Sequence, residues 1–306
     1  MYTNLVLSSG ALKGFIILGC LKNIEKDLEN IKEYTGCSVG SIINFFLLLN
    51  YKIDDIYDIF LFEFQNFLNL FEQKYNINNI DDYIITFFYQ YGIIDHTNLQ
   101  EVLIKYLKQK HNKTSITFLE CAKIFGKNFI VNSSNVSKHT TVFFDINNTP
   151  DMNIIDAICM SCAIPFIVKP IKYKDDYYVD GALYHEFPLK YFSKNKLETI
   201  GIYIDYDFHK NKYSNILEYI YYMYIGLIKN NNNLQENNID FKKFNIYKIN
   251  INQLSDDLKK LNIDNTNEII ISNDSNLDFN NFKYKLNKTI IKFYYNYGLT
   301  HFNLKT

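Results

Sequence analysis

Residues 36–40 have the pattern Gly-x-Ser-x-Gly, in which Ser38 lies between a predicted strand and a predicted apolar helix. A nucleophilic serine needs this setting, because a sharp turn lifts its hydroxyl above the sheet and small neighbours let a substrate approach. The N-terminus of the following helix also stabilises negative charge. The pattern therefore predicts nucleophilic catalysis by Ser38 between Gly36 and Gly40. The structural alternative is that Ser38 only caps the helix.

A second turn, residues 8–14, precedes another predicted helix and would present consecutive backbone N–H groups. Such groups form either a phosphate cradle or an oxyanion hole. A dinucleotide site needs Gly-x-Gly-x-x-Gly, whereas the corresponding residues here are Ser9, Ala11 and Gly14. A Walker-type loop needs Gly-Lys before Ser or Thr, and here the order is reversed, with Lys13 before Gly14. An oxyanion hole beside the serine turn fits better.

A serine hydroxyl is a weak nucleophile until a base accepts its proton. Asp180 ends a short predicted strand and precedes Gly181, which places a carboxylate where it can point into a site. The structural alternative is an ordinary Asp-Gly turn. Of the 6 histidines, only His185 lies close to this motif in the sequence. An exposed loop residue is the preferred interpretation of His185, and an additional base is the alternative.

The elements that would position these residues alternate between strands and helices. Strands are predicted at residues 5–7, 32–35, 128–133, 140–145, 177–179 and 199–204, and helices at 15–24, 41–49, 118–125 and 153–161. Two strand-to-helix turns in succession indicate a parallel α/β sheet with helices on its faces. Residues 54–107 have an aromatic-rich helical pattern that suits a helical insertion, and residues 164–173 are predicted to be extended.

The pattern weakens after about residue 210. A Tyr-rich helix is predicted at residues 216–228, strands at 245–251 and 268–272, and a closing helix at 282–297. The helix at 216–228 suits a membrane interface, where Tyr is favoured, but it lacks a basic face, so packing on the domain is preferred. No linker is visible in the 306 residues. We therefore expect a catalytic core over 1–210 and further elements over 211–306 packed on the same domain.

Composition argues against several functional classes. Lys+Arg 32 against Asp+Glu 33 gives a net charge of -1, without the clustered cations that nucleic acid requires. The 5 cysteines are odd in number and mostly lie in apolar runs, which indicates buried thiols and neither disulfides nor a zinc site. The N-terminus lacks a basic n-region, and no apolar stretch reaches about 18 residues. We expect a cytoplasmic protein without a signal peptide, transmembrane helix, metal or cofactor.

The three motifs, in this order, resemble those of the patatin-like phospholipases. That family combines a glycine-rich oxyanion turn, a Gly-x-Ser-x-Gly turn and a later Asp-Gly-Gly/Ala, which correspond here to residues 8–14, 36–40 and 180–182. Residues 163–165 and 187–188 are also similar, so the resemblance covers roughly residues 4–205. It implies a three-layer α/β patatin-like fold, with a mostly parallel central sheet flanked by helices and a helical insertion after the serine turn.

The resemblance also implies a Ser-Asp dyad that hydrolyses the acyl ester of a phospholipid or a related lipid during transient contact with a membrane surface. Ser38 would attack the ester and Asp180 would act as the general base. The N–H groups of Gly10, Ala11 and Leu12 would bind the oxyanion. The supporting motif residues are Ser9, Lys13, Gly14, Gly36, Gly40 and Gly181. Lys13 would either bind a headgroup phosphate or tie down nearby carbonyl groups.

Two segments depart from the family's pattern. Ser9 and Ala11 stand where the family usually has glycine, which restricts the oxyanion turn, although alanine can adopt conformations with φ < 0. Loss of one oxyanion donor would cost on the order of a hundredfold in rate. Glu186 stands where the family more often has Asn. Two alternatives to hydrolysis stay open: a catalytically impaired lipid-binding protein, and a transacylase that transfers the acyl group to an alcohol.

Overall fold

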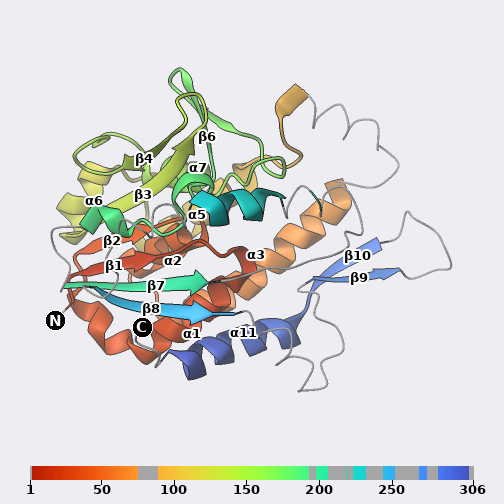
Figure 1. Cartoon of the computed structure of the whole chain (residues 1–306), viewed down its shortest axis with the longest axis horizontal. Coiled ribbons are helices and arrows are strands. Elements are labelled where there is room, and N and C mark those ends of the chain that lie inside the picture. The colour runs from red at the N-terminus through yellow and green to blue at the C-terminus, as the bar shows by residue number, and fades with distance from the viewer. Residues whose placement is uncertain are drawn as a thin grey trace.

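The computed structural model describes residues 2–74, 89–192, 198–205, 219, 223–231, 244–251, 269–273 and 282–302. In these ranges the chain forms a central sheet flanked by helices, and α helices and strands alternate along much of the sequence (Figure 1). The predicted three-layer α/β architecture is confirmed.

The parallel part of the sheet carries both functional turns. β1 (Asn4–Leu7) lies between β2 (Glu33–Gly36) and β7 (Thr199–Asp205) and pairs in parallel with both. β3 (Asn128–Asn135) pairs with the other side of β2, and β8 (Asn245–Asn250) with the other side of β7, again in parallel. Parallel neighbours need long crossover connections, and helices supply most of them here. The prediction of a mostly parallel sheet is therefore confirmed.

The described antiparallel pairs lie at one edge of this sheet and in a separate hairpin. β4 (Thr140–Phe144) and β6 (Asp176–Val179) both pair with β3, and β5 (Ile171–Tyr173) pairs with β6. β9 (Ile269–Asn273) and β10 (Phe282–Leu286) pair only with each other within the described residues. The end of β6 thus lies near the end of β3, which brings Asp180 toward the carboxyl edge of the parallel strands.

Helices and short 3-10 segments connect the strands. The α helices are α1 (Gly14–Asn23), α2 (Val39–Leu48), α3 (Ile53–Lys74), α5 (Thr97–His111), α6 (Phe118–Phe125), α7 (Ile154–Ser161), α8 (Ala182–His185) and α11 (Lys288–His301). The 3-10 segments are η1 (Ala11–Lys13), η2 (Glu25–Asn30) and η4 (Leu189–Phe192). α3 and α5 follow the serine turn as the predicted helical insertion, and residues 75–88 between them lie outside the described part of the chain.

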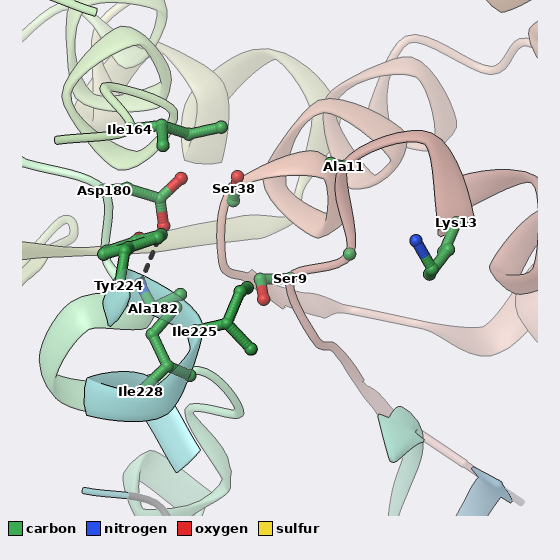
Figure 2. A pocket seen from close by; sticks show the side chains of 11 residues that line it. Ser9, Ala11, Lys13, Ser38, Ile164, Asp180, Ala182, Tyr224, Ile225 and Ile228 are labelled. Carbon is green, nitrogen blue, oxygen red and sulfur yellow. Dashed lines mark hydrogen bonds between the residues drawn. The ribbon is translucent and has the colours of Figure 1, made fainter. Parts of the chain in front are cut away.

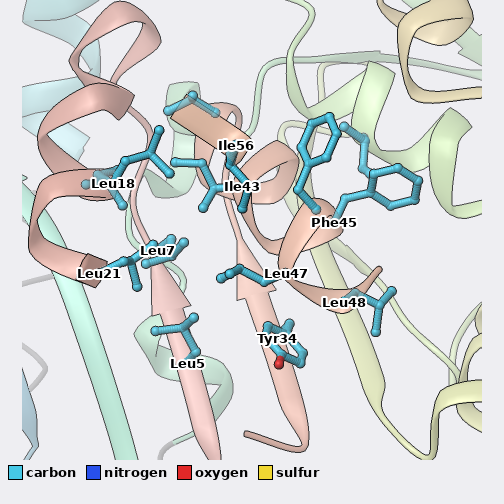
Figure 3. Packing of buried hydrophobic residues seen from close by; sticks show 14 of the residues in the cluster. Leu5, Leu7, Leu18, Leu21, Tyr34, Ile43, Phe45, Leu47, Leu48 and Ile56 are labelled. Atoms are coloured by element: carbon cyan, nitrogen blue, oxygen red, sulfur yellow. The ribbon is translucent and has the colours of Figure 1, made fainter. Parts of the chain in front are cut away.

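Side chains of β1 are buried on both faces of the sheet. Leu5 and Leu7 belong to the largest core cluster, which apolar side chains of α1 and α2 complete (Figure 3). Val6 points to the other face, where it belongs to a smaller cluster with Phe187 and Tyr203. Alternation along a strand with both faces buried is typical of an inner strand of an α/β sheet. This packing fixes β1 and β2, from which the two functional turns emerge.

Residues 164–173 correct one prediction, because they are not extended throughout. The Val168 N–H donates to the Ile164 carbonyl oxygen at 2.8 Å, which closes a turn before β5. Pro165 lies in that turn, where its fixed φ is compatible with the first central position. The proline therefore promotes a turn where the sequence interpretation placed an extended segment.

The predicted closing helix at residues 282–297 is also wrong in its first part. Apolar residues alternate with lysines along β10, a period of two that suits a strand. α11 begins only after Asn287, whose side chain accepts a hydrogen bond from the Ile290 N–H at 3.3 Å. Asn at this position caps the helix and separates it from the strand.

α11 packs along α1, next to the sheet (Figure 1). The two helices approach each other at Gly19 and Gly298, where an added Cβ on either residue would collide with the backbone of the other helix. This contact joins the C-terminal helix to the N-terminal part of the fold. The predicted boundary at residue 210 lies outside the described residues and stays a prediction.

The predicted helix at residues 216–228 is described only at Tyr219 and from Met223 onward. Residues 223–231 are helical, and the remainder of the prediction lies outside the described residues. None of the described helices combines the length and the hydropathy that crossing a bilayer requires.

Candidate active site

Ser38 lies at the turn between β2 and α2 in an uncommon backbone conformation, with φ 50 and ψ -124. This conformation is strained for a residue that has a side chain, and such strain is found most often at functional sites. Ser38 occupies the N-cap position of α2, but its side chain makes no capping hydrogen bond. The alternative interpretation of Ser38 as a helix cap is therefore wrong.

The two glycines of the motif allow this sharp turn. A Cβ at Gly36 would lie 2.5 Å from the Gly40 carbonyl carbon, and a Cβ at Gly40 would lie 2.6 Å from the carbonyl oxygens of Leu7 and Ser8. Both distances are shorter than real Cβ atoms tolerate. The start of α2 can therefore approach the ends of β1 and β2 only because neither position has a side chain.

The backbone around Ser38 is held on both sides. Its N–H donates to Ser161 Oγ at 2.8 Å, at the end of α7. Its carbonyl oxygen accepts hydrogen bonds from Ser41 Oγ at 2.6 Å and from the Ser41 N–H at 2.9 Å. These contacts use the main chain of Ser38 and leave its hydroxyl directed toward the pocket (Figure 2).

Asp180 follows β6 and is buried, with 2% of its surface exposed. Its Oδ1 accepts a hydrogen bond from the Ala182 N–H at 2.8 Å, and its own N–H donates to the Ala163 carbonyl oxygen at 2.8 Å. Figure 2 shows the carboxylate facing the Ser38 hydroxyl. The structure thus brings together the two side chains that the sequence placed far apart.

Burial raises the pKa of Asp180 from 3.8 to about 6. The hydroxyl groups of Ser38 and Tyr224 and the Ala182 N–H act in the opposite direction, because they stabilise the ionised carboxylate. A carboxylate with a pKa of about 6 is ionised at neutral pH and is a stronger base than an exposed aspartate. These properties suit a general base.

Gly181 holds the aspartate segment close to β3. A Cβ there would lie 2.5 Å from the Asn132 carbonyl oxygen, so only glycine fits. The Asn132 side chain donates to the His185 carbonyl oxygen at 2.8 Å, and Ser133 Oγ donates to the Val179 carbonyl oxygen at 2.7 Å. Buried polar side chains of β3 therefore position the segment on both sides of Asp180.

The oxyanion turn corrects the expectation for Ala11. Its φ is 45, in the left-handed region that glycine tolerates better than alanine, and not in the φ < 0 range. Within the described part of the chain, the N–H groups of Gly10, Ala11 and Leu12 donate no hydrogen bond to a protein acceptor. Gly10 and Ala11 line the pocket, whereas the Leu12 side chain belongs to the core. Among the described residues these three amide donors are thus unused, and two of them belong to residues that line the pocket together with Ser38.

Two further residues of this turn have structural contacts. A Cβ at Gly14 would lie 2.6 Å from Val39 Cγ2, so the absence of a side chain lets the first turns of α1 and α2 meet. Lys13 lines the pocket, and its Nζ lies 6.0 Å from the centre of the Tyr294 ring. Both roles predicted for Lys13 stay predictions.

The pocket is a small cavity of about 40 Å³ that is partly open to solvent. Its polar lining comes from the serine turn, the oxyanion turn and Asp180, and its apolar lining from Ile164, Tyr224, Ile225 and Ile228 (Figure 2). The sequence interpretation did not assign the last three to the site. Their helical spacing was visible as an apolar pattern, but nothing in it indicated which part of the sheet they would cover.

His185 is not the exposed loop residue that the sequence analysis preferred. It ends α8, only 5% of its surface is exposed, and its ring centre lies 6.2 Å from that of Phe143. It does not line the pocket that contains Ser38 and Asp180. The structure therefore places this histidine in the packing behind the aspartate segment.

Glu186 is also buried, and it contacts the oxyanion turn. Its Oε1 accepts a hydrogen bond from Ser9 Oγ at 2.8 Å. Two of the three positions at which this chain departs from the family's pattern are thus paired. Among the described residues, no group of three His, Cys, Asp or Glu side chains is arranged to hold a metal ion.

Fold and site together define a class of α/β proteins in which a serine on a strand-to-helix turn faces an aspartate at a nearby strand end. The chain belongs to the patatin-like phospholipase family, because the family described as Patatin-like phospholipase matches residues 5–193. The resemblance drawn from the three motifs is confirmed. The catalytic roles of the individual residues stay predictions.

Two viral proteins are similar to this chain. The protein named Probable lipid hydrolase 463L from Invertebrate iridescent virus 6 is 32% identical over 188 residues, which cover 61% of this chain and 62% of that protein. Uncharacterized protein R571 from Acanthamoeba polyphaga mimivirus is 32% identical over 204 residues, which cover 65% of this chain and 64% of that protein. The chain thus spans less than two thirds of the length of these curated relatives.

Among solved structures, VipD from Legionella pneumophila is similar with a TM-score of 0.45 and 17% sequence identity. The similarity covers 72% of this chain and 52% of VipD.

Proposed function

We propose that this protein is a lipid acyl hydrolase that cleaves carboxylic esters through an acyl-enzyme on Ser38. The observation that carries the proposal is the Ser38 hydroxyl on its strained turn, facing the buried Asp180 carboxylate in one pocket. Membership of the patatin-like phospholipase family and similarity to a protein named as a probable lipid hydrolase support the same chemistry.

In the first half of the reaction, Ser38 Oγ attacks the carbonyl carbon of the ester and its proton passes to the Asp180 carboxylate. The oxyanion that forms accepts hydrogen bonds from the unused N–H groups of Gly10, Ala11 and Leu12. The carbon–oxygen bond to the leaving alcohol then breaks, and the protonated Asp180 returns the proton to that alcohol. The acyl group stays on Ser38.

In the second half, a water molecule attacks the acyl carbon and loses a proton to Asp180. The bond to Ser38 Oγ breaks, the proton returns to Ser38, and a free fatty acid leaves. The raised pKa of Asp180 suits both halves, because the same carboxylate must accept a proton and then release it. No cofactor takes part in this sequence of steps.

The apolar lining of the pocket supports an acyl-chain substrate. Ile164, Ile225 and Ile228 line the same pocket as Ser38, and their apolar side chains suit the hydrocarbon part of a lipid. Lys13 lies at the polar side of the same pocket, where its charge suits the phosphate of a phospholipid headgroup. A phospholipid or another acyl ester is therefore the proposed substrate class.

Apolar side chains next to the pocket suit transient contact with a membrane surface. Met223 and Leu227 are 49% and 54% exposed on the helix whose other side lines the pocket, and Phe166 is 46% exposed in the turn that starts at Ile164. Met223→Ser with Leu227→Ser should reduce sedimentation with phosphatidylcholine vesicles. Ile124→Ser is the matched control, since Ile124 is 47% exposed on α6, away from the pocket. Equal loss in both variants would contradict this assignment.

Activity-based labelling tests the proposed reaction. A fluorophosphonate should label the parent protein, and Ser38→Ala should abolish the label. Asp180→Asn should slow both labelling and ester hydrolysis, because the serine then has no base. Unlabelled parent protein that hydrolyses neither short nor long acyl esters would contradict the proposal.

One alternative is a lipid-binding protein with impaired catalysis, and the observation that favours it is the strained conformation of Ala11. In that case vesicle binding would be unchanged by Ser38→Ala and the parent would show no esterase activity. Product analysis with and without a glycerol-type acceptor distinguishes hydrolysis from acyl transfer, since a transacylase would form a new ester in place of the fatty acid.

A further inference from the structure

Two of the three departures from the family's motifs, Ser9 and Glu186, form one buried contact in this chain. Ser9 Oγ donates to Glu186 Oε1 at 2.8 Å, and the Ser9 N–H donates to the Glu186 carbonyl oxygen at 3.3 Å. The two residues are 6% and 2% exposed and lie 177 positions apart in the sequence. A glycine at position 9 could make only the main-chain bond, so the side-chain bond depends on the serine hydroxyl.

This contact joins the two segments that the proposed reaction needs. Ser9 immediately precedes Gly10 and Ala11 of the oxyanion turn, and Glu186 follows α8, which begins just after Asp180. The Ser9–Glu186 pair therefore connects the oxyanion donors to the segment of the general base.

Ser8, the first residue of the oxyanion turn, is hydrogen-bonded to β7. The Ser8 N–H donates to the Ile202 carbonyl oxygen at 3.1 Å, and Ser8 Oγ accepts from the Ile204 N–H at 3.1 Å. Ser8 is thus fixed to the sheet through the main chain of β7. Ser9 comes directly before Gly10 and Ala11, and its side chain is hydrogen-bonded to Glu186.

The turn needs such an anchor because of Ala11. Its φ of 45 is unfavourable for alanine, so the turn would relax toward negative φ if nothing opposed it. Relaxation would redirect the N–H groups that bind the oxyanion, and small displacements of such groups have large effects on rate. The buried Glu186 carboxylate, in turn, needs a hydrogen-bond donor, which the Ser9 hydroxyl supplies.

We propose that Glu186 is a positioning residue that holds the oxyanion turn in its strained conformation through Ser9. Glu186 does not line the pocket, so it does not touch the substrate. Its effect on turnover rests on the proposed function, whereas its effect on the order of the turn does not.

The test compares Glu186→Ala and Ser9→Ala with the conservative variant Glu186→Gln, whose amide oxygen can still accept from Ser9. Hydrogen–deuterium exchange at the Lys13 amide, which donates to the Gly10 carbonyl oxygen at 2.8 Å and closes the turn, should become at least about tenfold faster in the two alanine variants and stay near the parent rate in Glu186→Gln. Asp145→Ala is the matched control. It removes another carboxylate that is buried and hydrogen-bonded, to Asn148 and Tyr191, away from the turn.

Activity gives the second measurement, with the soluble ester p-nitrophenyl butyrate. Glu186→Ala should lower kcat about tenfold or more with little change in KM, and the double variant with Ser9→Ala should fall no further. Glu186→Gln should restore most of kcat. Unchanged exchange at the Lys13 amide, or additive losses in the double variant, would overturn the proposal.

The two proposals fail in different ways. If the parent protein shows no esterase activity and no labelling at Ser38, the proposed function fails, while the exchange measurement still decides whether Glu186 fixes the turn. If Glu186→Ala does not fold, Ser9→Ala removes the same hydrogen bond by deleting only a hydroxyl.

Discussion

The Ser38 N–H donates a hydrogen bond to Ser161 Oγ at 2.8 Å, so the last residue of α7 holds the strained serine turn. Ser161 is fully buried. Ser161→Ala would leave a buried N–H without its acceptor, and we expect the free energy of unfolding to fall by about 1–3 kcal/mol. The turn would also lose its alignment, so fluorophosphonate labelling of Ser38 should slow by roughly tenfold. Urea denaturation and labelling rates measure the two effects.

Thr117→Ala provides the control for this prediction. Thr117 caps α6 through the Glu120 N–H, at a distance from the serine turn, and its loss should cost about 1 kcal/mol. Labelling of Ser38 should be unchanged in this variant. If both variants slow labelling equally, the effect of Ser161 is one of general stability.

The pH dependence of activity should report the titration of Asp180. Burial raises its pKa to about 6, and only the ionised carboxylate can accept the Ser38 proton. We expect kcat/KM to rise with pH through about 6 and then level off. A pH–rate profile measured with a soluble ester checks this. A midpoint near 4, the ordinary value for aspartate, would show that the base is another group or is exposed to solvent.

The same raised pKa has a consequence for stability. The folded state favours the protonated carboxyl of Asp180, and this preference adds to the free energy of unfolding. The added stability is fully present below the unfolded pKa of 3.8 and is lost as the pH rises through about 6. Asp180→Asn carries no charge and can still accept from the Ala182 N–H. We expect this variant to be more stable than the parent at about pH 7, by roughly 2–3 kcal/mol, and to lose that advantage toward about pH 4. Urea denaturation at both pH values measures the difference.

Ala11→Gly should stabilise the protein. The φ of Ala11 lies in the left-handed region, so glycine would remove strain of about 1 kcal/mol, less the entropy that a glycine adds to the unfolded chain. Ala122→Gly, in the middle of α6, should instead destabilise by about 0.5–1 kcal/mol. Thermal unfolding of both variants tests this contrast. Two losses of similar size would mean that Ala11 is not strained.

Gly40→Ala should be strongly destabilising, because its Cβ would lie 2.6 Å from the carbonyl oxygens of Leu7 and Ser8. Main-chain atoms cannot move aside easily, and we expect a cost of about 1–3 kcal/mol together with loss of labelling at Ser38. Gly226→Ala is the matched control. An added Cβ there meets no atom within 4 Å, and the residue is helical, so this change should stabilise by about 0.5–1 kcal/mol. A neutral Gly40→Ala would contradict the close approach of α2 to β1.

The sequence by itself determined the local elements and the two functional turns. β1, β2 and the helices that follow them are specified by short apolar runs and by glycines at sharp turns, and these preferences act between near neighbours. The same holds for Asp180 and Gly181 at the end of β6. Three motifs in a fixed order were enough to indicate the family, because each is a local pattern tied to one turn.

The tertiary structure decided what those patterns contact. Local preference favours negative φ for alanine, yet contacts around the oxyanion turn hold Ala11 at φ 45. The burial of His185 depends on packing against β4, and the hydrogen bond from Ser9 to Glu186 joins residues 177 positions apart. Tyr224 reaches the pocket from a helix whose sequence shows only an apolar face. Such contacts depend on how distant elements pack, and short-range periodicity carries no information about their partners.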